Sequence, residues 1–189
     1  MKSFTLIELL VVVSLILILS ILIVPNFHLA NSKLAVERAA YKLAQDLRNT
    51  QEMAMSSRAT SLSLFGSTLF PSGGYGLSFD DNSTSYILFA DCNNNQVYDT
   101  AKGLPVSCAA SGAANTRAEL IKEIFLESGV KITTASIKQL TFFPPDPIIR
   151  ISPSFASPPS VILTSTKDQA KGFSVDINEV GRIEISPWP

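Results

Sequence analysis

An uninterrupted apolar run near the N-terminus constrains this chain more than any other feature. Phe4–Val24 covers 21 residues and contains one charged side chain, Glu8. As an α-helix, a run of this length extends about 31 Å, which matches the hydrocarbon thickness of a bilayer. In lipid the backbone must satisfy its own hydrogen bonds, so the β-branched valines and isoleucines do not prevent a helix. The sequence therefore predicts a transmembrane helix over residues 4–25.

Glu8 separates this run from two simpler kinds of apolar segment. A secretory signal peptide has a shorter apolar region and a small-x-small cleavage site after it. An ordinary anchor accounts for the length but not for the acid, because a carboxylate near the centre of a span costs about 2.5–3.5 kcal/mol on insertion scales. Glu8 is therefore a candidate functional residue, and the alternative is that it lies close enough to the interface to stay hydrated.

The residues around Glu8 resemble the N-terminal signature of type IV pilins and pseudopilins. The signature is carried by Phe4–Val13 (FTLIELLVVV), with Pro25 at the end of the apolar run. The resemblance implies that a prepilin peptidase removes residues 1–3, including the basic Lys2, as a leader peptide. Cleavage would fall between Ser3 and Phe4, and Phe4 would then be N-methylated. The family usually has Gly before the cut, where this chain has Ser3.

Cleavage would place two opposite charges close together in the membrane. Phe4 would carry an α-ammonium group and Glu8 a carboxylate, and such charges attract strongly where the dielectric constant is low. They can pair within one helix, or the carboxylate can meet the ammonium of a neighbouring subunit. The resemblance implies the second arrangement, so Glu8 and Pro25 are predicted to be assembly residues.

Beyond Pro25, which is expected to kink or locally open the helix, the pattern predicts an amphipathic helical continuation over residues 26–58. Apolar residues recur there at spacings of three, four and seven, which favours one buried face. The residues of this face are Val36, Ala39, Ala40, Leu43, Leu47 and Ala54.

Residues 59–189 are predicted to form an extracytoplasmic β-rich domain, so the fold class is α+β: a long N-terminal helix packed on an antiparallel β domain, as in pilins. Arg117–Ser128 fits either a short helix or a strand. Pro71–Gly74 and Asn178–Gly181 are expected to be hairpin connections, and the prolines between 144 and 159 indicate edge strands and a loop. The predicted strands are Ser61–Phe65, Tyr75–Phe79, Tyr86–Phe89, Ile137–Phe143, Ile148–Ile151, Val161–Thr164, Phe173–Ile177 and Gly181–Ile185.

Within the pseudopilins, the layout is similar to the GspH/FimT branch. The similarity rests on Leu43–Gln51, on Ile87–Asp91 before an Asn-rich turn, and on Gly181–Ile185. It implies a minor pseudopilin of a type II secretion system, held in the inner membrane by one span with its C-terminal domain in the periplasm or outside the cell. The implied partners are other pseudopilins or pilins, the prepilin peptidase, the inner-membrane assembly platform and membrane lipid.

The alternative function is a minor type IV pilin of the FimT kind, acting in pilus assembly, adhesion or DNA uptake. Some FimT-type relatives bind DNA through a basic Gly-Arg-x-Arg strand, but Glu184 stands at the second Arg position. The chain has 15 Lys and Arg against 16 Asp and Glu. Since nucleic-acid binding relies on an excess of cations, general nucleic-acid binding is not expected.

The segment 91–99 has oxygen-bearing side chains at alternate positions, as calcium loops do. Asp91, Asn93, Asn95 and Asp99 are the candidate calcium ligands. Gln96 stands where such a loop has its turn Gly, and Lys102 where it has a bidentate Glu. The alternative, a solvated turn held by its own side chains, is favoured.

The two cysteines, Cys92 and Cys108, both follow the predicted span and would share an oxidising compartment. They are predicted to form a disulfide, and the alternative is two separate buried thiols. With one His and two Cys, a multi-ligand zinc, haem or iron–sulfur site is not expected. The sequence has no nucleophile-elbow, Walker or His–carboxylate pattern, so an enzyme is not predicted.

Overall fold

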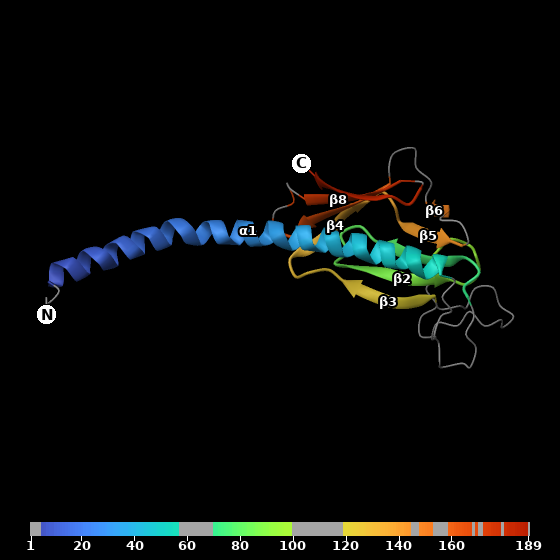
Figure 1. The fold of residues 1–189 in the computed structure, drawn as a ribbon, viewed down its shortest axis with the longest axis horizontal. Coiled ribbons are helices and arrows are strands. Elements are labelled where there is room, and N and C mark those ends of the chain that lie inside the picture. The colour runs from blue at the N-terminus through green and yellow to red at the C-terminus, as the bar shows by residue number, and fades with distance from the viewer. Residues whose placement is uncertain are drawn as a thin grey trace.

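One long helix precedes an antiparallel β domain in the computed structural model (Figure 1). The structure describes residues 5–56, 70–99, 119–144, 148–152, 159–167, 169, 172–178 and 180–188, with the side chains of 22–30 and of 148 left out. The elements are α1 (Leu6–Met55), β1 (Gly74–Phe79), β2 (Ser85–Asp91), β3 (Leu120–Phe125), β4 (Val130–Ala135), β5 (Gln139–Phe143), β6 (Ile148–Ser152), β7 (Ser160–Ser165), β8 (Gly172–Ile177) and β9 (Ile183–Trp188).

Helix α1 is continuous over 50 residues. It begins after Thr5, whose extended backbone and side-chain oxygen cap the first turn, and it does not end or open at Pro25. It ends at Met55, three residues before the predicted boundary at 58. Its N-terminal part extends away from the β domain, whereas its C-terminal part lies across that domain (Figure 1).

The described strands form two sheets, and all neighbouring strands are antiparallel. The five-stranded sheet has the order β3-β2-β1-β5-β6, and the four-stranded sheet has the order β4-β7-β8-β9. Helix α1 contacts β1 and β5 of the first sheet and all four strands of the second. One helix therefore covers both sheets and joins them through a shared core.

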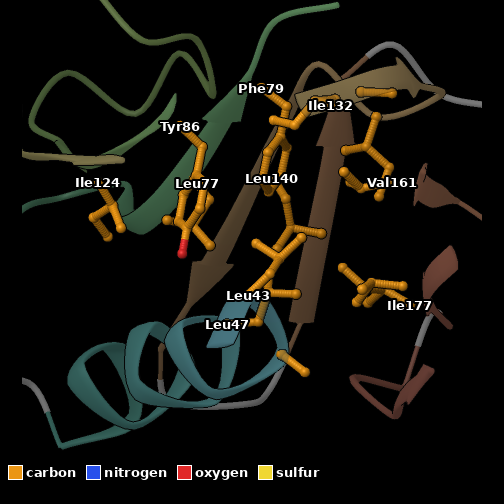
Figure 2. Close-up of a cluster of buried hydrophobic side chains, with 14 of the residues drawn as sticks. Leu43, Leu47, Leu77, Phe79, Tyr86, Ile124, Ile132, Leu140, Val161 and Ile177 are labelled. Carbon is orange, nitrogen blue, oxygen red and sulfur yellow. The ribbon is translucent and has the colours of Figure 1, made fainter. Parts of the chain in front are cut away.

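The core lies where α1 meets the two sheets (Figure 2). Leu43 and Leu47 point from the helix towards Leu140 and Phe79, and Val161 and Ile177 complete the cluster from the second sheet. All six residues of the predicted helical face, Val36, Ala39, Ala40, Leu43, Leu47 and Ala54, are buried. That prediction is confirmed.

The α+β class and the antiparallel pairing are confirmed, and most predicted strands lie within one or two residues of the observed ones. The ambiguous segment Arg117–Ser128 contains strand β3, so its helical alternative is wrong over Leu120–Phe125. Strand β4 (Val130–Ala135) was not predicted. The predicted strand Ser61–Phe65 lies outside the described residues.

The turn predictions have different outcomes. Asn178–Gly181 does connect β8 to β9, with Asn178 N donating to Arg182 O (3.1 Å) and Gly181 at φ +86°. Pro71–Gly74 forms a turn in which Gly74 N donates to Pro71 O (3.1 Å) and which leads into β1. The hairpin prediction itself is not tested, because the predicted strand Ser61–Phe65 lies outside the described residues. Strand β6, next to the proline-rich segment, is at a sheet edge, as expected.

Candidate functional site

The N-terminal end of α1 holds Glu8 in a reciprocal cap with Thr5. Glu8 N donates to Thr5 Oγ1 (3.3 Å), and Thr5 N and Thr5 Oγ1 donate to Glu8 Oε2 (3.5 and 3.4 Å). A carboxylate in the first turn also interacts favourably with the helix dipole. Glu8 is therefore placed at the start of the helix by local hydrogen bonds. Ser3 and Phe4, the predicted cleavage residues, and the side chain of Pro25 lie outside the described residues.

The first turns of α1 carry apolar side chains that the rest of the chain does not cover. Every residue from Thr5 to Ile21 is exposed, and Leu6 is 82% accessible. Among the described residues, no stretch of helix is both long and apolar enough to cross a membrane.

The segment 91–99 is organised around the buried carboxylate of Asp91. Asp91 Oδ1 accepts from Asn95 N (3.2 Å) and Oδ2 accepts from Gln96 N (2.9 Å). Burial raises the pKa of Asp91, and the backbone hydrogen bonds oppose that rise. A Cβ added to Gly73 would lie 2.1 Å from Asp91 Cγ. A glycine at 73 therefore makes room for the acid that shapes this segment.

A second buried acid, Glu119, binds the same segment from outside it. Glu119 Oε1 accepts from Cys92 N (3.0 Å), and Oε2 accepts from Asp99 N (3.0 Å). Its side chain thus joins the two ends of the segment. Burial raises the pKa of Glu119 to about 7, and the nearby charges of Asp91 and Asp99 act in the same direction.

The four predicted calcium ligands lie close together, but their oxygen atoms already accept hydrogen bonds. Asn93 Nδ2 and Asn95 Nδ2 donate to Asp99 Oδ2 (2.6 and 3.0 Å), while Asn93 Oδ1 and Asn95 Oδ1 accept backbone N–H groups. Among the described residues, no three His, Cys, Asp or Glu side chains are grouped to hold a metal ion. The geometry fits the favoured alternative, a turn held by its own side chains.

Cys92, within this segment, is disulfide-bonded. Cys108, the predicted partner, lies outside the described residues.

Sequence reasoning missed Gly73 and Glu119, which fix the segment 91–99. Glu119 lies 20 residues after Asp99 and belongs to no local motif, so only the pairing of β3 with β2 brings it to Cys92. The one signal available was a charged residue directly before Leu120 and Ile121, the apolar start of β3.

A groove of about 320 Å³ lies between α1 and strands β2 and β3. Asp46, Glu52 and Met53 line its helix side, and Leu88 and Lys122 line its sheet side. Beside it, Tyr86 Oη donates to Asp46 Oδ2 (2.5 Å). Burial, reinforced by the hydrogen bond and charge of Asp46, raises the pKa of Tyr86.

Replacing Tyr86 by phenylalanine is expected to lower the free energy of unfolding by about 1–2 kcal/mol, because the carboxylate of Asp46 loses a hydrogen-bond donor. Urea unfolding of the full chain in detergent micelles measures this. Tyr41→Phe is the control, since Tyr41 is exposed on α1, the helix that carries Asp46. Equal stabilities of the two variants would show that the Tyr86–Asp46 hydrogen bond contributes nothing.

Comparison with protein-family models, curated proteins and solved structures found no match to this chain.

Proposed function

We propose that this chain is a minor pseudopilin of a type II secretion system, with a membrane-spanning first half of α1 and a pilin-like fold. The observation that carries the proposal is the exposed apolar half of α1, Leu6–Ile21, which projects from a folded β domain. Exposed apolar surface on this scale is costly in water and needs lipid or other subunits to cover it. The span is proposed for the sequence run Phe4–Val24, of which the described side chains cover Thr5–Ile21.

In this proposal α1 has two roles. Its first half lies in the inner membrane before assembly and packs against other pseudopilins in a periplasmic filament afterwards. Its second half is bound to both sheets of the β domain, so a displacement of the helix carries the domain with it. The protein has no catalytic function, and its mechanism is polymerisation that drives protein export.

A minor type IV pilin of the FimT kind is the second candidate, because the same exposed helix would serve it. The C-terminal strands favour the secretion role over DNA uptake. Directly before β9, the guanidinium of Arg182 forms an ion pair with Glu184 of that strand (Nη2–Oε1 2.5 Å), so this basic group is matched by an acid. From Val161 to Pro189 the sequence has three basic and four acidic residues.

Mass spectrometry of the N-terminus of the purified full-length protein tests the proposal. The expected species begins at an N-methylated Phe4. A chain that keeps Met1, or that begins near Asn26, would contradict both the pseudopilin and the pilin versions. Deleting the secretin or the retraction ATPase of the producing organism then separates the two: the first should abolish the chain's role in export, and the second its role in a pilus.

Replacing Glu8 by alanine is expected to leave membrane insertion intact and to lower incorporation into filaments at least about tenfold. The reason is that the ammonium group of Phe4 would lose its carboxylate partner in a medium of low dielectric constant. Co-purification of the variant with filament subunits measures incorporation, and membrane fractionation measures insertion. Glu37→Ala, on the same helix but beyond the apolar run, is the matched control. Normal co-assembly of the Glu8 variant would contradict the assembly role of Glu8.

A further inference from the structure

Strand β3 is an edge strand that the rest of the described chain leaves open. It is the first strand of the five-stranded sheet and, among the described residues, pairs with β2 alone. Five of its six residues are exposed, and only Ile124 is buried. Three of the exposed side chains are large and apolar: Leu120, Ile121 and Phe125, the last 63% accessible. Native edge strands are usually short, covered or marked by charged side chains, because an open edge can pair with another strand. Strand β3 has two such charges, Lys122 and Glu123, beside its three exposed apolar side chains.

The hydrogen bonds between β3 and β2 show which backbone groups of β3 point away from β2. Leu126 N donates to Thr84 O (2.9 Å), and antiparallel pairs alternate between bonded and non-bonded positions. Glu123 and Phe125 therefore direct their N–H and C=O groups away from β2. Phe125 O already accepts from Lys42 Nζ (3.2 Å) of α1. Among the described residues, no other strand pairs with the backbone groups of Glu123 or with the N–H of Phe125.

The groove of about 320 Å³ lies on the helix side of this edge and shares Lys122 and Ile124 with β3. Its helix side carries two carboxylates, Asp46 and Glu52, and the apolar Met53, and its sheet side carries Leu88. Among the described residues, no ion pair joins Lys122 to either carboxylate. The groove therefore matches a side chain with an apolar stem and a cationic end.

We propose that the edge of β3 binds an extended segment of a partner protein, which adds a strand to the sheet and places a lysine or arginine side chain in the groove beside Asp46 and Glu52. Backbone hydrogen bonds would supply part of the affinity and the groove the specificity, as in other cases of strand addition. The proposal concerns the β domain and does not depend on whether the chain assembles into a filament.

A second copy of this chain fits the edge less well. When two β3 edges meet antiparallel, opposite residues must lie on the same face of the continuous sheet. The central registers then put Lys122 opposite Lys122 of the second copy, or Glu123 opposite Glu123 of the second copy. Like charges in directly opposite positions are destabilising.

The test uses the full chain in detergent micelles and blocked six-residue peptides of alternating threonine and valine with one central lysine. Amide hydrogen exchange is expected to show new protection over Leu120–Phe125 when the lysine peptide is present. Fluorescence anisotropy of the labelled peptide is expected to give weaker binding for a peptide with glutamate in place of lysine.

Glu52→Lys is expected to weaken binding of the lysine peptide about fivefold and to strengthen binding of the glutamate peptide, because the charge at the groove is reversed. Asp80→Lys, an exposed charge reversal after β1, is the control and should change neither affinity. Protection confined to β9, equal affinity for both peptides, or loss of both in the Asp80 variant would overturn the proposal. Protection of β3 that rises with protein concentration in the absence of peptide would also overturn it, in favour of a second copy.

Discussion

Replacing Gly74 by alanine is expected to lower the free energy of unfolding by about 2–4 kcal/mol. Gly74 has φ +85°, where an L-residue pays about 1 kcal/mol. An added Cβ would also lie 2.0 Å from Phe142 O. That atom belongs to the backbone of β5, which pairs with β1 directly beside Gly74, so it cannot move aside as a flexible side chain would. Overpacking of this kind adds about 1–3 kcal/mol.

Gly129→Ala is the matched control for Gly74→Ala. Gly129 has φ +86°, nearly the same as Gly74, but nothing lies within 4 Å of an added Cβ. This variant should lose only the conformational part, about 1 kcal/mol. Urea unfolding of both full-length variants, followed by near-ultraviolet circular dichroism, measures the difference. Equal losses would mean that β1 and β5 are not held as closely as the structure has them.

Local patterns predicted the helix and most strands because the spacing of apolar residues along the sequence indicates which side chains are buried. In α1, Leu43 and Leu47 repeat at a helical interval and are fully buried. In β4 the same kind of signal was present, since Val130 and Ile132 are buried while Lys131 is half-buried. The strand was missed because it follows the polar residues Glu127 and Ser128 and itself contains two adjacent threonines. The division into two sheets had no local signal, because it depends on pairings between distant strands.

The candidate sites also differ in whether their contacts are local in sequence or depend on strand pairing. The cap formed by Thr5 and Glu8 was not predicted, although it is a contact between residues three apart and has the spacing of a capping box. Glu119 holds the two ends of the segment 91–99 by hydrogen bonds to Cys92 N and Asp99 N, and the room for Asp91 depends on Gly73. Both are long-range contacts that only the strand pairing creates. Sequence reasoning therefore found the candidate ligands but not Glu119 and Gly73, which hold their segment in place.

The buried carboxyl of Glu119 is expected to make the stability of the β domain depend on pH between about 4.5 and 7. Its pKa is raised from 4.5 to about 7 in the folded state, with burial as the main cause. Between these two values the folded protein binds the proton more tightly than the unfolded chain does. The free energy of unfolding should therefore fall as pH rises, because a charged Glu119 is costly inside the domain. The contribution of Glu119 is fully present below pH 4.5 and is lost above pH 7, a change of about 3 kcal/mol.

Glu119→Gln isolates this effect, because the amide does not titrate. Its Oε1 can accept from only one of Cys92 N and Asp99 N, and its Nε2 cannot accept from the other. The variant should therefore be less stable than the wild type at pH 4.5, by about 1–3 kcal/mol. That deficit should shrink towards pH 7.5, or change sign, as the wild type acquires its buried charge.

Glu123→Gln, on the exposed face of the strand that follows Glu119, is the control for a general charge effect. Its free energy of unfolding should change with pH as that of the wild type does. Urea unfolding of the three full-length proteins at pH 4.5, 6 and 7.5 measures the slopes. If the free energy of unfolding of the Glu119 variant also changes with pH as that of the wild type does, the carboxyl of Glu119 does not titrate in this range. The contacts of Glu119 with the two ends of the segment 91–99 then do not depend on its charge.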